Sequence, residues 1–189
     1  MKQVVPKNVL SNKKKNKKKA NIKSFKRNNL LKKKYGTSQL ERKFATDFLD
    51  RMGLVYIYQY EAKEIKRFYD FALTCDNGVE YVFEEKDGIR SVKQDGQFFS
   101  VDLLIEVDGS FFHADPRIVK EDKITPMHKH NKFVDGLKDQ WAGMHCIPLL
   151  RIWEYDIIHN PKMVEKEIEK YVNSGKKKIQ KLKNKKKPH

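Results

Sequence analysis

The chain has 189 residues and a formal net charge of +16 that is concentrated at its ends: residues 1–34 carry +14 and residues 175–189 carry +8, neither with an acid, so residues 35–174 are left with −6. This length predicts one domain with appendages, and no apolar run approaches the ~20 residues of a spanning helix or the apolar core of a secretory signal. We expect a soluble intracellular protein without a disulfide framework or a cysteine-rich zinc site, in which Cys75 and Cys146 are small core residues.

Both ends of the chain are rich in lysine. Such segments cannot bury enough apolar surface to fold alone, so we expect residues 1–34 and 175–189 to be disordered tails around a folded domain at residues 35–174. Lysine tails favour nucleic acid through the release of counterions from phosphates. A solubilising role, a nuclear-import signal and an anionic membrane surface are the alternatives. The N-terminal lysines that we expect to bind DNA are Lys13, Lys14, Lys15, Lys17, Lys18 and Lys19.

The first periodic segment after the basic tail predicts a helix over residues 38–52. Its apolar side chains recur at helical spacing until Gly53, a natural stop. Ser38 and Glu41 have the spacing of a capping box. Glu41 also lies at the margin of the buried helix face, so either capping or a place beside a neighbouring site explains it.

Two strands follow, and the second contains an acid. Residues 54–60 are β-branched and aromatic, and residues 67–73 are similar except for Asp70. Asp is depleted in strands and this one is flanked by aromatic residues, so its presence requires a reason. A pair with Arg67 is one reason and a functional site is another. Residues 79–92 then predict an inserted hairpin around an Asp-Gly turn.

Residues 103–113 carry the clearest signal in the chain. Their first half is aliphatic, as in a strand buried on both faces, yet Glu106 and Asp108 lie two residues apart and so on the same side of the pleat. Burying charge is costly without a cation or a partner, and oxygen ligands indicate Mg²⁺ or a similar hard ion. An edge strand with solvated acids is the alternative. Gly109 allows a turn that would bring His113 back over the same end of the sheet.

The elements that follow complete the domain. Asn131, Asp135 and Lys138 lie on one face of a predicted helix, which a solvated face would explain in isolation. The segments are a loop at residues 116–127, that helix at residues 128–142, an aliphatic strand at residues 145–152, and a last helix that begins near Pro161.

The order helix, strand, two acid-bearing strands, helix and strand, over residues 38–157, resembles the αβββαβ core of the PD-(D/E)XK nucleases. It resembles more closely the very-short-patch-repair (Vsr) endonucleases and the related EDxHD homing endonucleases. The resemblance implies an α/β, restriction-endonuclease-like fold with a mixed central sheet flanked by helices. The residues that carry it are Glu41 in the first helix, Asp70 in Arg-Phe-Tyr-Asp-Phe-Ala, His113 in Asp-Gly-Ser-Phe-Phe-His, Asp135 in Asn-Lys-Phe-Val-Asp, and the Leu-Leu-Arg-Ile-Trp-Glu run of residues 149–154.

The resemblance implies a metal-dependent DNA endonuclease. Asp70, Glu106 and the carbonyl of Val107 would hold Mg²⁺ or Mn²⁺, which would polarise the phosphate and lower the pKa of a bound water. Asp108 would be a further ligand or would bind through water. Asp108 stands where the Vsr run has its first histidine, and the lysine of a standard (D/E)XK motif is absent, so the identity of the general base is open.

The remaining candidates surround the metal. His113 would activate water or protonate the leaving oxygen, and Asp135 would fix its tautomer. Glu41 would support the metal ligands or hold a second ion, and we expect Lys138 to contact DNA. The candidate catalytic residues are therefore Asp70, Glu106, His113, Asp135 and Glu41.

We expect the protein to bind double-stranded DNA and not to associate with a membrane. We expect the cytoplasm as the location, nucleoid-associated or in a host cell if the protein is viral. Nicking or double-strand cutting, the role in repair, homing or phage DNA processing, and the oligomeric state are open. The competing hypothesis is a non-catalytic nucleic-acid-binding protein built on a decayed nuclease fold.

Overall fold

The computed structural model describes residues 39–75, 80–94 and 99–185, with side chains described as far as residue 177. The N-terminal lysines expected to bind DNA and the expected cap Ser38 lie outside this part. The described elements are α2 (Gln39–Phe44), the π-helical η1 (Ala45–Asp50), β1 (Val55–Ala62), β2 (Arg67–Thr74), β3 (Phe83–Lys86), β4 (Ile89–Val92), β5 (Leu103–Asp108), the 3-10 turn η2 (Glu121–Lys123), α3 (Pro126–Met144), β6 (Leu149–Trp153), α4 (Glu154–His159) and α5 (Pro161–Lys185).

A mixed four-stranded sheet with the order β1-β2-β5-β6 forms the centre of the fold. β1 pairs with β2 and β2 with β5 in antiparallel fashion, whereas β5 and β6 are parallel. A parallel pair requires a crossover, and α3 supplies it. The predicted hairpin is confirmed as β3 and β4, which form a separate two-stranded sheet. The expected mixed α/β architecture is therefore confirmed.

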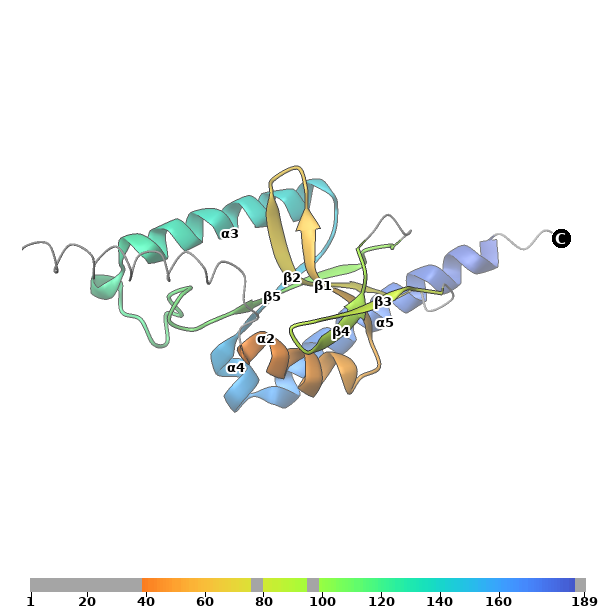
Figure 1. Cartoon of the computed structure of the whole chain (residues 1–189), viewed down its shortest axis with the longest axis horizontal. Coiled ribbons are helices and arrows are strands. Elements are labelled where there is room, and N and C mark those ends of the chain that lie inside the picture. The colour runs from red at the N-terminus through yellow and green to blue at the C-terminus, as the bar shows by residue number, and fades with distance from the viewer. Residues whose placement is uncertain (1–38, 76–79, 95–98, 186–189) are drawn as a thin grey trace, which may run out of the picture. The chain divides into compact units, whose positions relative to one another are not determined.

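Helices cover both faces of this sheet (Figure 1). On one face Trp141 and Ala142 of α3 pack with Leu104 of β5 and with residues of β1 and β2. On the other face, apolar side chains of α2, η1, α4 and α5 pack against the strands, with Ile105 of β5 among them. Consecutive β5 residues thus enter opposite cores, and every residue of β5 is buried. The expectation of a strand buried on both faces is confirmed.

The C-terminal part of the chain differs from the prediction in two respects. The short helix α4 was not predicted, and α5 continues to Lys185, so the expectation that the segment from residue 175 onward is disordered is wrong as far as residue 185. The physical reason is that Val164 and Ile168 anchor the first turns of α5 in the core, and lysine is a good helix former once a helix is nucleated.

Cys146 is exposed, so its predicted place in the core is wrong. It lies in the turn between α3 and β6 with a left-handed φ of 54°. Cys75 is partly buried. Among the described helices, none is long and apolar enough to cross a membrane.

Candidate active site

Strand β5 presents two buried acids to α3. Leu104 belongs to the core under α3, and because side chains alternate along a strand, Glu106 and Asp108 project to that same face. Each is 3% exposed. The alternative of an edge strand with solvated acids is therefore wrong, because β5 lies between β2 and β6 and both carboxylates are enclosed.

Asp70 lies where β2 separates from β5. The described pairing of these strands runs from Leu73↔Leu103 to Phe71↔Ile105. At the next position the Asp70 side chain takes the place of a main-chain partner, since its Oδ2 accepts the N–H of Val107 at 2.7 Å. Arg67, which the sequence offered as a possible partner of Asp70, donates to the carbonyl of Lys66. Asp70 thus completes the sheet hydrogen bonding at a half-buried position.

The environment of Asp70 disfavours its charge. Burial raises the pKa of Asp70 well above its ordinary value, and the charges of Glu106 and Glu41 raise it further, against the opposing effects of Lys138 and the Val107 N–H. Glu41 is held in place by Tyr58, whose hydroxyl donates to Glu41 Oε2 at 2.7 Å. Carboxylates from α2 and β5 therefore both act on the charge of Asp70, and the role expected of Glu41 stays a prediction.

Glu106 has an ammonium partner on one oxygen only. Lys138 Nζ of α3 donates to Glu106 Oε2 at 2.7 Å, with the two side chains 12% and 4% exposed. Glu106 Oε1 is buried and has no hydrogen-bond partner among the described residues. Burial raises the pKa of Glu106 although Lys138 and Arg151 oppose that rise. A buried acceptor without a donor is costly, so Oε1 marks a place suited to a ligand.

His113 returns to the site through a turn after β5. The main-chain N–H of His113 donates to the carbonyl of Gly109 at 3.0 Å. The side chain of Asn131 in α3 donates to the carbonyl of Phe112 at 2.8 Å, and this bond joins the turn to the helix. The chain turns after β5 as expected, but the left-handed residue of the turn is Ala114 (φ 54°), and Gly109 does not take a positive φ. Local hydrogen bonds thus place the imidazole over α3.

His113 and Asp135 form a hydrogen-bonded pair. The imidazole Nδ1 lies 2.9 Å from Asp135 Oδ2 and 3.5 Å from Asp108 Oδ1. Burial lowers the pKa of His113, but the hydrogen bond to Asp135 and the charges of Asp108 and Asp135 outweigh it and leave the pKa raised. The ligand atoms of these three residues lie within 4.8 Å of one another, a spacing that also suits a metal ion.

Arg151 of β6 is a site residue that the sequence did not reveal. Its Nη1 lies 3.2 Å from both oxygens of Asp108 and 3.4 Å from Asp135 Oδ1, and its Nη2 lies 3.0 Å from Asp139. The parallel register places Arg151 opposite Glu106. Asp108 thus already has a cationic partner, unlike Glu106 Oε1.

The structure sorts the predicted residues into two neighbouring groups. Asp70, Glu106 and Glu41 form one, and Asp108, His113 and Asp135 form the other. Lys138, which is expected to contact DNA, lies between α3 and β5 and pairs with Glu106. The solvated-face alternative for Asn131, Asp135 and Lys138 is wrong, because all three contact the site. The sequence pointed to Lys138 because it lies three residues after Asp135 on the same helix face. Nothing marked Arg151 except that it is a cationic residue within a strand.

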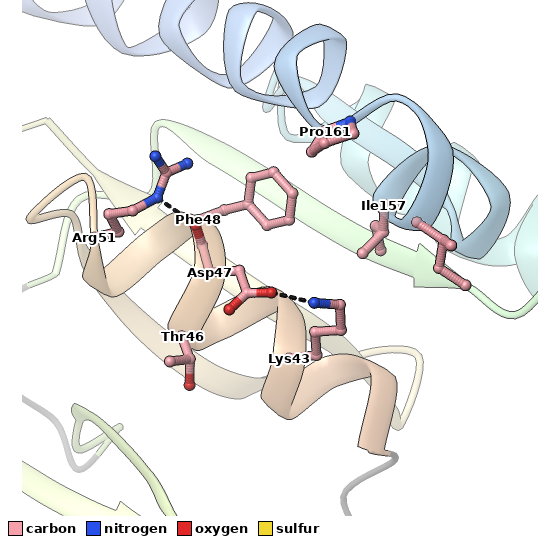
Figure 2. A pocket seen from close by; sticks show the side chains of 8 residues that line it. Lys43, Thr46, Asp47, Phe48, Arg51, Ile157 and Pro161 are labelled. Carbon is pink, nitrogen blue, oxygen red and sulfur yellow. Dashed lines mark hydrogen bonds and ion pairs between the residues drawn. The ribbon is translucent and has the colours of Figure 1, made fainter.

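A hollow of about 540 Å³ lies elsewhere on the domain, between the first helical segment and the start of α5 (Figure 2). Lys43 and Asp47 form an ion pair on its rim, and Phe48, Ile157 and Pro161 supply apolar walls. None of the predicted site residues lines it. The acids between the sheet and the helices therefore remain the candidate site.

Comparison with known proteins does not identify a family. No protein-family model matches the chain, and neither a curated protein nor a solved structure matches it significantly.

Proposed function

We propose that the protein is a metal-dependent DNA endonuclease that hydrolyses phosphodiester bonds. The observation that carries this proposal concerns Glu106, a buried carboxylate. Its Oε1 lacks a hydrogen-bond partner in the described part of the chain, and its negative charge repels that of Asp70. Two carboxylates that repel each other in a buried site are costly without a cation. A divalent cation shared by Glu106 and Asp70 would remove that cost.

The donor set suits a hard cation. Asp70, Glu106 and the carbonyl of Val107 would hold Mg²⁺ or Mn²⁺ through oxygen alone. When bound, the ion would supply charge to the scissile phosphate and make water a better nucleophile. Asp70 is only half-buried, so a ligand has a route to it. Asp108 is the weaker candidate ligand, because Arg151 already neutralises it.

His113 is the proposed proton carrier. Asp135 holds Nδ1 at 2.9 Å, which leaves Nε2 as the nitrogen that faces a substrate. The neutral imidazole accepts a proton from attacking water at Nε2, and the charged imidazole donates one to the leaving oxygen. The hydrogen bond to Asp135 and the charges of Asp108 and Asp135 raise the pKa of His113, which favours the charged imidazole that donates to the leaving oxygen.

The order of elements also supports this function. A helix with Glu41, strands with Asp70 and Glu106, a helix with Asp135 and a closing parallel strand occur in the order expected for a restriction-endonuclease-like core of the Vsr type. Phe111 and Phe112 are 57% and 59% exposed beside His113. Exposed aromatic rings suit stacking on nucleic-acid bases.

DNA affinity would come from outside the acidic domain. Residues 35–174 carry −6, which repels a polyanion, whereas the lysine-rich ends carry the positive charge. Such contacts position DNA without reading its sequence. We propose that the lysines at positions 13–19 act in this way.

One observation favours a non-catalytic protein as the second candidate. Lys138 and Arg151 already pair with Glu106 and Asp108, and acids that are neutralised internally do not require a metal. In that case the fold would be a scaffold and the lysine-rich ends would bind nucleic acid. This candidate predicts no stabilisation by Mg²⁺.

Cleavage of supercoiled plasmid in Mg²⁺ tests the proposal. The full chain should give nicked or linear product, and Asp70→Ala and His113→Ala should each lose it. Asp122→Ala, which changes an acid that is 67% exposed, is the matched control and should cleave normally. If the full chain binds plasmid, mismatched and branched DNA tightly but cleaves none of them, the non-catalytic scaffold is correct.

A further inference from the structure

Lys138 is held in the site by Glu106 and by Tyr69. Its ammonium lies 2.7 Å from Glu106 Oε2 and 5.6 Å from the centre of the Tyr69 ring. The Tyr69 hydroxyl donates to the main-chain carbonyl of Lys138 at 2.6 Å, and the Tyr69 ring packs on Trp141. By contrast, Lys132 on the same helix is exposed. The contacts fix the backbone of Lys138 and leave its long stem as the movable part.

The ammonium and a divalent cation would compete for one carboxylate. Glu106 is the shared partner, since Lys138 occupies Oε2 while Oε1 is open. A carboxylate that donates its charge to a divalent ion attracts an ammonium less strongly. Lysine is a compact charge on a flexible stem, and the Tyr69 face gives the ammonium a second favourable surface nearby. Lys138 can therefore leave Glu106 without leaving the site.

We propose that Lys138 is a phosphate-binding residue whose ammonium rests on Glu106 until a divalent cation binds there, and then contacts a non-bridging oxygen of a phosphodiester. The inference rests on the proposed function for its metal site and adds the group that recognises the substrate. The ligand class is a phosphate oxyanion adjacent to the cation. An ammonium already within the site needs only a change of rotamer to reach it.

The proposal separates metal binding from phosphate binding. Removing the ammonium removes the competitor for Glu106, so metal affinity should rise. The same change removes a donor to the phosphate, so phosphate affinity of the metal-loaded protein should fall. A lysine that serves only as a structural ion pair would not produce these opposite shifts.

The test uses the full chain with Lys138→Met and, in case that variant does not fold, Lys138→Gln. Lys132→Met is the control on the same helix. Calorimetry with Mn²⁺ alone measures metal affinity, and calorimetry of inorganic phosphate against the Mn²⁺-loaded protein measures oxyanion affinity. Neither readout requires cleavage, so loss of nuclease activity and failure of this inference are distinguishable.

For either Lys138 variant we expect Mn²⁺ to bind about fivefold more tightly or better, and phosphate to bind about tenfold more weakly or worse. Lys132→Met should change neither value. Unchanged or weaker Mn²⁺ binding in the Lys138 variants would overturn the competition, and unchanged phosphate binding would overturn the phosphate contact. If both shifts occur and the wild-type chain cuts no DNA, the Lys138 role stands and the endonuclease proposal fails.

Discussion

Replacing Asp70 by asparagine tests the charge balance of the site. The amide has the shape of the carboxylate, and its carbonyl oxygen can still accept the Val107 N–H that Asp70 accepts at 2.7 Å. The change therefore removes one charge and leaves the splayed strands in place. Without a metal, we expect Asp70→Asn to be more stable than the wild-type chain at pH 8.

The magnitude follows from the neighbours of Asp70. At an effective dielectric constant of about 20, two like charges about 4 Å apart repel by roughly 4 kcal/mol, and the repulsion falls as the distance between them grows. Glu106 and Glu41 both contribute such repulsion, and Lys138 opposes it. We therefore expect a net gain of about 1–3 kcal/mol, which corresponds to a rise in melting temperature of about 2–12 °C for a domain of this size.

The stability difference between the Asp70→Asn variant and the wild-type chain should increase with pH. The pKa of Asp70 in the folded protein is raised above its ordinary value of 3.8, so the protonated form contributes stability at low pH that is lost as the pH rises through the folded pKa. The stability advantage of the Asp70→Asn variant over the wild type should thus be small near pH 4 and should grow as the pH rises.

Thermal melting in EDTA and in Mg²⁺ checks this prediction. Mg²⁺ should stabilise the wild-type chain and leave Asp70→Asn unchanged, since an ion at 100 times its Kd adds about 2.7 kcal/mol. Asp122→Asn, at an exposed position, should behave as the wild type in both buffers. An Asp70→Asn variant that melts below the wild type in EDTA at pH 8 would refute the reasoning.

Three further predictions concern other parts of the molecule. Asp135→Asn should lower the pKa of His113 because it removes the hydrogen-bonded carboxylate that raises it, and it should slow cleavage by about 10²-fold; an NMR titration of His113 that shows no downward shift would contradict this. Arg117→Met should destabilise the protein at pH 7, because Arg117 pairs with the fully buried Asp115 and with Asp156. The pKa of each acid is lowered, so this stabilisation is present above the ordinary pKa of 3.8 and is lost as the pH falls below that value. Urea titrations in which the variant loses the same free energy of unfolding at pH 7 and at pH 3 would count against the pairing. Deleting residues 1–34 should weaken DNA binding and flatten its salt dependence, by a slope of about 0.9 for each phosphate that the lysines no longer neutralise, while Mg²⁺ stabilisation persists; binding that is unchanged across a salt series would contradict the role of the lysines.

The local elements were largely predictable because their patterns are short-range. Alternation and β-branched content predicted β1, β2 and β5, and helical spacing predicted the first helix and α3 to within a few residues. Asp70 was singled out because an acid is unusual inside a strand. The structure shows what it does there, since its carboxylate accepts the Val107 N–H where the strands part.

The pairing of charges across elements was not predictable in the same way. Lys138 reaches Glu106 only because α3 crosses β5 at a particular position, and Arg151 reaches Asp108 only because β6 pairs with β5 in a particular register. Neither the crossing position nor the register can be deduced from local periodicity. The helical course of residues 175–185 was missed for a related reason, because composition describes a segment alone and not as the continuation of a packed helix.

The central claim is that Asp70 and Glu106 hold a divalent cation. Anomalous diffraction from crystals soaked in Mn²⁺ tests it most directly, because it locates the ion without reference to activity. We predict an anomalous peak within coordination distance of Asp70 and Glu106 Oε1, with the Lys138 ammonium displaced from Glu106. A peak among Asp108, His113 and Asp135 alone, or no peak at a Mn²⁺ concentration that saturates any thermal shift, would contradict the account.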